Sequence, residues 1–131
     1  MNDDKKELIE GLWLTGAKDA HVHVWIGEDD RAYGKVAWME RDANKDGSKP
    51  RVDELNPKKD LRSRTLEGLV ILDGFQYKGD GEWEEGKVYD PDTGNTYSGT
   101  IKNNGPNVLK MHGYVGIKLF GRSENWIRID D

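Results

Sequence analysis

Gly11-Leu12-Trp13 begins the first extended run of the chain, and Trp126-Ile127-Arg128-Ile129 ends the last one. A guanidinium group is attracted to the electron-rich face of an indole ring and can stack over it. Trp13 in the first strand and Arg128 in the last are therefore suited to meet where a sheet closes on itself. We expect Trp13, Trp126 and Arg128 to have a structural role in this closure.

Alternating polar and apolar residues fill the chain between these two runs. Residues 20–28 place aliphatic side chains on one face and His21, His23 and Trp25 on the other. Residues 31–40 return as the second strand of a hairpin. Further strands are predicted at 68–77, 82–89, 96–102, 108–115 and 122–129, separated by turns rich in Gly, Asn and Pro. The pattern predicts an all-β, antiparallel, up-and-down barrel of about eight strands, with an open two-sheet sandwich as the alternative.

Outside the predicted strands, the chain has a short N-terminal segment and one long connection. Asp3 or Asp4 can cap a short N-terminal helix that ends at Gly11, with residues 1–8 as a lead-in. Residues 41–66 form a long polar connection, in which residues 58–64 can hold one helical turn. At 131 residues, the sequence predicts a single domain over 1–131.

Composition excludes several classes of function. The net charge is −5, and Lys and Arg are interspersed with Asp and Glu, so we expect no nucleic-acid partner. The chain has no cysteine, which excludes disulfides and thiolate chemistry. No apolar run approaches the length of a membrane span.

Several motifs together resemble a known bacterial family. They are Gly11-x-Trp13; Gly34-Lys35-Val36-x-Trp38; Asp53-x-x-Asn56-Pro57; Leu61-Arg62-x-Arg64; Gly68-Leu69-x-Ile71-Leu72; Trp83-x-x-Gly86-Lys87-Val88-Tyr89-Asp90-Pro91-x-x-Gly94-x-Thr96-Tyr97; Gly113-Tyr114-x-Gly116; and Gly121-Arg122-x-x-x-Trp126-x-Arg128. This combination, which covers residues 9–129, is similar to domain-of-unknown-function family 2147, a group of small and usually exported bacterial proteins.

The resemblance implies a lipocalin-like (calycin) barrel, in which Trp13 and Arg128 match the Gly-x-Trp and closing-Arg pair of lipocalins. It implies no reaction. It also implies export, so we expect a periplasmic or secreted protein. The first six residues contain no apolar region of a signal peptide, which keeps the cytoplasm as the alternative.

A barrel of this size can enclose one small ligand between apolar walls and a few polar groups. The aromatic and histidine residues predicted to line such a cavity are His23, Trp25, Trp38, Tyr97, His112 and Tyr114. Alternatively, these side chains simply fill the barrel. Arg62 and Arg64, spaced i and i+2, can clamp a carboxylate or phosphate at the barrel mouth, or anchor the long connection instead.

Two metal sites are compatible with the sequence. Asp42, Asn44 and Asp46, with Gly47 and then Asp53, have the spacing of a calcium-binding loop. Pro50 within that loop, the flanking strands and an Asp in place of the final Glu favour a polar turn without metal. His21 and His23 on one strand face, with His112, have the residue types of a zinc site.

No catalytic motif is present: the chain lacks a nucleophile elbow, a phosphate loop and a dinucleotide-binding glycine motif. The leading hypothesis is a noncatalytic, monomeric binding protein that holds a small, partly apolar ligand, such as a lipid, in the barrel cavity, without a cofactor. The alternatives are an envelope-associated protein-interaction module and, less favoured, a hydrolase at the barrel mouth around Asp53, Arg62 and Arg64.

Overall fold

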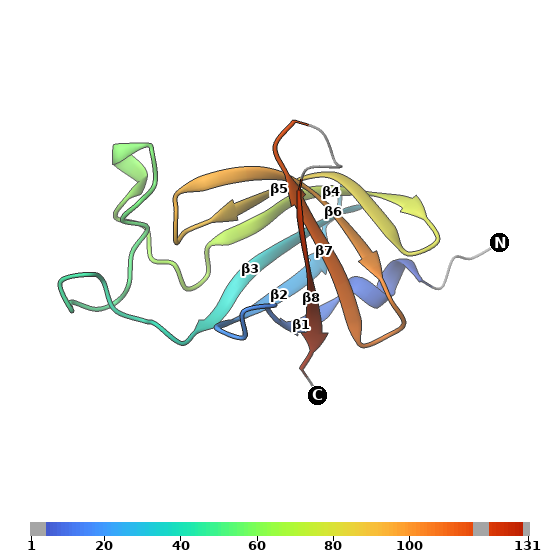
Figure 1. Ribbon diagram of the computed structural model, residues 1–131, viewed down its shortest axis with the longest axis horizontal. Coiled ribbons are helices and arrows are strands. Elements are labelled where there is room, and N and C mark those ends of the chain that lie inside the picture. Colours follow the sequence, from blue (N-terminus) through green and yellow to red (C-terminus); the bar gives the residue numbers. More distant parts are fainter. Residues whose placement is uncertain (1–4, 117–120, 130–131) are drawn as a thin grey trace.

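A computed structural model describes residues 5–116 and 121–129, and it shows antiparallel strands that close into a barrel (Figure 1). The strands are β1 (Gly11–Leu14), β2 (Ala20–Ile26), β3 (Arg31–Met39), β4 (Val70–Gly79), β5 (Glu82–Asp90), β6 (Asn95–Asn103), β7 (Val108–Tyr114) and β8 (Arg122–Arg128). Each strand pairs with the next, and β8 pairs with β1. The predicted eight-stranded antiparallel barrel is confirmed, and the two-sheet sandwich is excluded.

The last strand closes the barrel through Arg128. Trp13 pairs with Arg128 in the register, and the guanidinium carbon lies 4.3 Å from the centroid of the indole ring. The same guanidinium donates hydrogen bonds to the backbone carbonyls of Glu10 at 2.7 Å, Leu8 at 2.5 Å and Pro106 at 2.8 Å. Arg128 therefore ties the N-terminal segment and the β6–β7 turn to the seam, as its predicted structural role requires.

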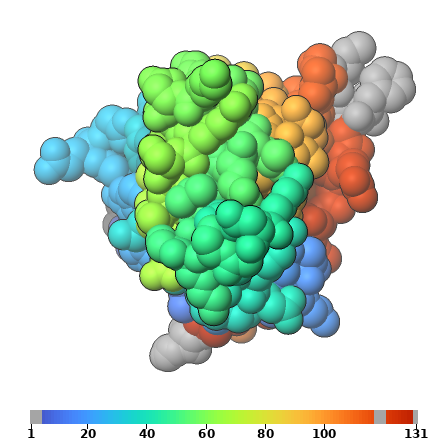
Figure 2. Space-filling model, turned by 90° about the vertical axis from the view of Figure 1, so that its left-hand side faces the viewer, coloured from blue at the N-terminus to red at the C-terminus, as the bar shows by residue number. Residues whose placement is uncertain are grey.

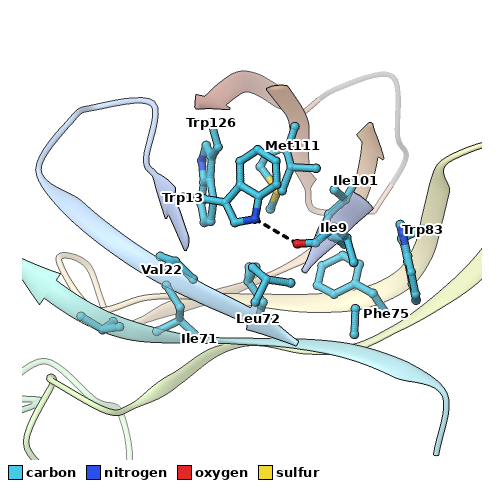
Figure 3. Packing of buried hydrophobic residues seen from close by; sticks show 14 residues of the cluster. Ile9, Trp13, Val22, Ile71, Leu72, Phe75, Trp83, Ile101, Met111 and Trp126 are labelled. Carbon is cyan, nitrogen blue, oxygen red and sulfur yellow. Dashed lines mark hydrogen bonds between the residues drawn. The ribbon is translucent and has the colours of Figure 1, made fainter. Parts of the chain in front are cut away.

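A short N-terminal helix covers this end of the barrel. It is the 3₁₀ helix η1 (Lys6–Ile9), and Ile9 is fully buried. The indole Nε1 of Trp13 donates to the carbonyl of Ile9 at 2.9 Å, shown by the dashed line in Figure 3. The proposed caps Asp3 and Asp4 lie outside the described residues. Within the described ranges, no helix is long and apolar enough to cross a membrane.

Large apolar side chains fill the barrel interior (Figure 3). The buried cluster consists of Ile9, Trp13, Val22, Val24, Ala32, Val36, Ile71, Leu72, Phe75, Trp83, Ile101, Leu109, Met111 and Trp126. Burial of apolar surface in such a cluster is the main source of stability in a domain of this size.

Two glycines make room for the largest of these contacts. Gly86 on β5 lies directly opposite Gly99 on β6. A Cβ atom at Gly86 would lie 2.3 Å from the Phe75 ring, and one at Gly99 would lie 3.1 Å from it. The fully buried Phe75 therefore packs against a patch of backbone that only glycine can provide.

The long connection between β3 and β4 spans residues 40–69 and lies at the end of the barrel opposite η1 (Figure 1). It contains the short 3₁₀ helix η2 (Lys59–Leu61), within the segment predicted to hold a helical turn. Viewed toward this end, the teal and green connection covers much of the molecule (Figure 2). Its Leu66 is buried, and the backbone of Gly68 and Leu69 bonds to Val36 on β3.

Candidate functional site

The side chains predicted to line a cavity from β2 and β3 lie on the outside of the barrel. Val22 and Val24 of β2 are buried, so His23 and Trp25 alternate to the outer face. Trp38 is 41% exposed and contacts the ring of His21 on that same face. The predicted inward orientation of His23, Trp25 and Trp38 is therefore wrong. The alternation of β2 was predicted correctly, but the face that points inward is the one with the smaller valines, where Val22 lies opposite Trp13.

The same correction applies to β7. Leu109 and Met111 are buried in the barrel, so His112 and Tyr114 point outward. The Nδ1 atom of His112 lies 2.7 Å from the hydroxyl of Ser123 on β8. Tyr97 differs from the others, because it lies on the inner face of β6, two residues before the buried Gly99, and is half-buried at the open end.

The polar centre of this end is the buried carboxylate of Asp53, in the long connection. Asp53 is fully buried and accepts three hydrogen bonds: from the Tyr89 hydroxyl at 2.5 Å, from Nδ2 of Asn56 at 2.8 Å and from Nη2 of Arg64 at 3.2 Å. Its backbone N–H also donates to the carbonyl of Arg64. We name these four residues, Asp53, Asn56, Arg64 and Tyr89, the Asp53 cluster. It fixes the connection to strand β5.

The cluster also controls the protonation of Tyr89. Burial, followed by the hydrogen bond to Asp53 and the charge of that carboxylate, raises the pKa of Tyr89 well above its ordinary value of 10.0. The phenol is therefore held as a hydrogen-bond donor.

This raised pKa predicts a loss of stability in alkali. In the unfolded chain Tyr89 ionises near pH 10.0, whereas the folded protein keeps the proton to higher pH. The stabilisation is therefore complete below that pH and is lost as the pH rises through the higher pKa of the folded state. We expect the free energy of unfolding, measured with urea below and above pH 10, to fall less in Tyr89→Phe than in the wild type. Equal losses in the two proteins would contradict this assignment, and the other tyrosines cancel in the comparison.

Arg62 and Arg64 do not act together as the predicted clamp. Nε of Arg62 donates to the backbone carbonyl of Asn56 at 2.6 Å, which supports the connection from within. The side chain of Arg64 contacts Asp53 at one end of the guanidinium group. It is also 43% exposed and therefore faces solvent. Arg62 therefore has the alternative role, that of anchoring the connection. Arg64, unlike Arg62, lines a hollow that a ligand can reach.

That hollow is a groove of about 320 Å³ between the connection and the outer face of β4, β5 and β6. We name it the β5 groove. Its apolar walls come from Pro57, Leu61, Val70 and Ile71. Its polar walls come from Asn56, Lys58, Arg64, Asp73, Lys87, Tyr89 and Thr96. Three cationic side chains thus face one carboxylate, Asp73, and the Lys87 ammonium also donates to Ser98 at 3.2 Å.

A second hollow, of about 310 Å³, lies between the long connection and the β1–β2 and β5–β6 turns. Its walls alternate in charge, with Asp19, Glu40 and Asp92 beside Arg41, Lys45 and Arg51. The buried Arg51 donates to Asp92 at 2.7 Å, and Arg41 also approaches Asp92 at 3.4 Å. These ions neutralise one another, so this hollow offers a ligand no excess of either charge.

The four residues of the predicted calcium loop do not converge. Asp46 accepts from the backbone and the hydroxyl of Ser48, and Asn44 accepts from the backbone N–H of Val52 at 2.7 Å. Asp42 is exposed and lies 3.5 Å from Lys49. Asp53 is held in its own cluster. Among the described residues, no three His, Asp or Glu side chains are arranged to hold a metal ion, and this includes His21, His23 and His112.

The sequence did not predict the groove residues contributed by β5 and β6. Lys87 and Tyr89 are two residues apart on β5, and the turn after Asp90 places Thr96 opposite Tyr89. The alternation of side chains along β5 and β6 was visible in the sequence. The sequence did not show which part of the outer face the long connection would cover. That depends on the hydrogen bond between Tyr89 and Asp53, which are 36 residues apart.

A closed barrel with successive antiparallel strands, a Gly-x-Trp in the first strand and an Arg stacked on that Trp from the last strand defines a lipocalin-like protein. The chain belongs to the family described as "Uncharacterized protein conserved in bacteria (DUF2147)", which matches residues 11–128. The family resemblance seen in the sequence is therefore confirmed.

One solved structure supports the same class. The protein HP1028 from the human pathogen Helicobacter pylori, described as belonging to the lipocalin family, is similar with a TM-score of 0.80 and 25% sequence identity. The similarity covers 94% of this chain and 84% of that one. The comparison with curated proteins found no match.

Proposed function

We propose that this protein is a noncatalytic binding protein for a small, partly apolar anion, which it holds in the β5 groove. The cationic side chains of that groove carry the proposal. Lys58, Arg64 and Lys87 line the groove beside the apolar surface of Leu61 and Pro57. They outnumber Asp73 and the buried Asp53, with which Arg64 pairs at 3.2 Å, so the groove has an excess of positive charge. A ligand with an acidic head and an apolar body matches this pairing of walls.

The location differs from the interior cavity that the sequence suggested. Phe75, Trp13 and Trp83 are fully buried and occupy the space that a ligand would need inside the barrel. The groove lies outside this packing, where one wall is the connection held by the Asp53 cluster. Because that wall is tied to β5 by hydrogen bonds, the site is formed before ligand arrives, which lowers the entropic cost of binding.

Binding without catalysis fits the state of Asp53. A general base must have a free lone pair aimed at a substrate proton. The carboxylate of Asp53 instead accepts from Tyr89, Asn56 and Arg64 and is closed off from solvent. The hydrolase alternative would need another base. We further propose that the protein acts as a monomer in the periplasm or outside the cell, as the family resemblance implies.

Anilinonaphthalene sulfonate, a small anion with an aromatic body, is a suitable probe. We expect saturable fluorescence enhancement with the wild type, and roughly tenfold weaker binding to the double variant Lys58→Gln with Lys87→Gln, because two charge-assisted contacts are lost. Lys102→Gln, on β6 and outside the groove, is the matched control. The uncharged analogue phenylnaphthylamine should bind more weakly than the sulfonate.

Equal affinity of the double variant and the wild type for the sulfonate would contradict the proposed site. Native mass spectrometry after mild purification provides a second measurement, because a co-purified ligand is expected to carry an acidic group. Tighter binding of the uncharged probe would instead favour the interior of the barrel.

A further inference from the structure

A continuous row of apolar and aromatic side chains crosses the outside of the barrel. In the strand register, Val108 on β7 pairs with Ile127 on β8, Ile127 with Leu14 on β1, Leu14 with His21 on β2, and His21 with Trp38 on β3. Side chains directly opposite one another on neighbouring strands lie on the same face. We name the outer face of β7, β8, β1, β2 and β3 the apolar face.

The row is open to solvent and has an aromatic extension. Ile127 is 44% exposed and Trp38 is 41% exposed. Beside them, the ring of Trp25 stacks on His23 at 5.9 Å and on Tyr33 at 5.8 Å. Nζ of Lys35 lies 5.9 Å from the Trp25 ring. Large apolar side chains gathered in this way on a surface mark an interaction site.

The apolar face also has a distinctive charge. The only acidic residue in its five strands is Glu124, which is exposed but lies on the same side of β8 as Trp126, opposite the apolar face, and accepts from Nε1 of Trp126 at 2.7 Å. The outward charged residues are Arg31, Lys35 and Lys110, and the three histidines lie on this face as well. The turn between β2 and β3, beyond this face, carries three carboxylates, on Glu28, Asp29 and Asp30. Asp29 accepts from the hydroxyl of Tyr33 and the backbone of Arg31, and Asp30 pairs with Lys6 at 2.6 Å.

Strands β4 and β5, on the other side of the barrel, are acidic overall outside the β5 groove. They carry five carboxylates, on Asp73, Glu82, Glu84, Glu85 and Asp90, against two ammonium groups, on Lys78 and Lys87, and the whole chain has a net charge of −5. An acidic protein that keeps carboxylates off one outer face presents that face to a negatively charged partner without repulsion.

We propose that the apolar face docks on the surface of an anionic lipid bilayer. Trp and Tyr favour the boundary between headgroups and acyl chains, aliphatic side chains enter it, and Lys and Arg pair with acidic headgroups. This face has all three kinds of residue. A nucleic acid binds through its phosphates and would leave the central aliphatic row without a partner. In a dimer formed through this face, the cations of the two copies would repel each other. The proposal is independent of the ligand in the β5 groove.

Flotation with vesicles tests the proposal on the full chain. We expect binding to vesicles made of equal parts phosphatidylcholine and phosphatidylglycerol, weaker binding to phosphatidylcholine alone, and loss of binding as salt is added. The double variant Trp38→Ser with Ile127→Ser, and separately Lys35→Glu, should each bind roughly tenfold more weakly.

Matched controls lie on the long connection. Leu55→Ser removes an exposed aliphatic side chain, and Lys59→Glu reverses an exposed charge, both away from the apolar face. Both controls should bind like the wild type. Circular dichroism shows whether each variant is folded, and Lys35→Glu, which changes an exposed side chain, keeps the test valid if the double variant unfolds.

Four results would overturn the proposal. The first is no flotation with acidic vesicles. The second is equal flotation of the wild type and both apolar-face variants. The third is a dimer in sedimentation equilibrium that Trp38→Ser with Ile127→Ser dissociates while vesicles are not bound. Retention on an acidic polymer without vesicle binding would also overturn it and assign the face to a polyanion.

Discussion

Gly86→Ala is expected to destabilise the barrel by roughly 3 kcal/mol, at the upper end of the cost of overpacking a core. The added Cβ would lie 2.3 Å from the Phe75 ring, which is fully buried and also packs closely against Gly99 on the next strand. For a domain of this size, the melting temperature should fall by roughly 10 °C. Thermal unfolding followed by circular dichroism measures this change.

Two further variants make the result specific. Gly113→Ala is the matched control, because a Cβ there meets its nearest neighbour at an ordinary 3.8 Å, and it should change stability little. Phe75→Leu should partly rescue Gly86→Ala, since the smaller side chain leaves room for the new methyl group. A stable Gly86→Ala protein would mean that the interior has space to spare, and a cavity inside the barrel would again be the better site for a ligand.

The packing around Phe75 therefore bears on function as well as on stability. A barrel of this kind can enclose a ligand only where its inner side chains leave room. Here Trp13, Phe75 and Trp83 fill that space, and the hollow with an excess of one charge lies outside, under the long connection. The fold class alone does not locate the site.

The closed fold was predictable because its signals are local or lie at the chain ends. Alternation with a period of two gave the strands, Gly and Asn gave the turns, and Trp13 with Arg128 gave the closure. The inward face of β2 was not predictable in the same way. Its two faces carry valines and aromatics, and the choice between them depends on the volume left by Trp13 and Leu72 on other strands.

The site was less predictable than the fold, for a related reason. Asp53, Asn56 and Arg64 belong to motifs visible in the sequence, and the structure brings them together around one carboxylate. Their partner Tyr89 lies on a distant strand, and nothing in the local pattern links it to Asp53. The connection has few regular elements, so its course depends on such long-range contacts and not on periodicity.

Asp53→Ala is expected to destabilise the protein by about 3 kcal/mol, a cost typical of leaving buried polar groups unpaired. The variant removes the acceptor of the half-buried Tyr89 hydroxyl and of the buried Asn56 amide. Arg64 is partly exposed and can turn to solvent, so its loss adds less. Urea unfolding at neutral pH measures the change, and Asp60→Ala on η2 is the exposed control.

A double-mutant cycle with Tyr89→Phe separates the hydrogen bond from the rest of the cluster. We expect a coupling energy of roughly 1–2 kcal/mol between the two positions, as for residues in one hydrogen-bonded network. A coupling near zero would mean that Tyr89 and Asp53 act independently, and the hydrogen bond would then not be what holds the connection to β5.

The same variants link stability to binding. If the Asp53 cluster fixes one wall of the β5 groove, then Tyr89→Phe, which keeps the ring and removes only the hydroxyl, should weaken anilinonaphthalene sulfonate binding in a protein that remains folded. Vesicle binding by the apolar face should be unchanged in this variant, because that face lies on other strands. Weakened probe binding with intact vesicle binding would assign the two surfaces separate roles, whereas unchanged probe binding would show that the connection does not form a wall of the site.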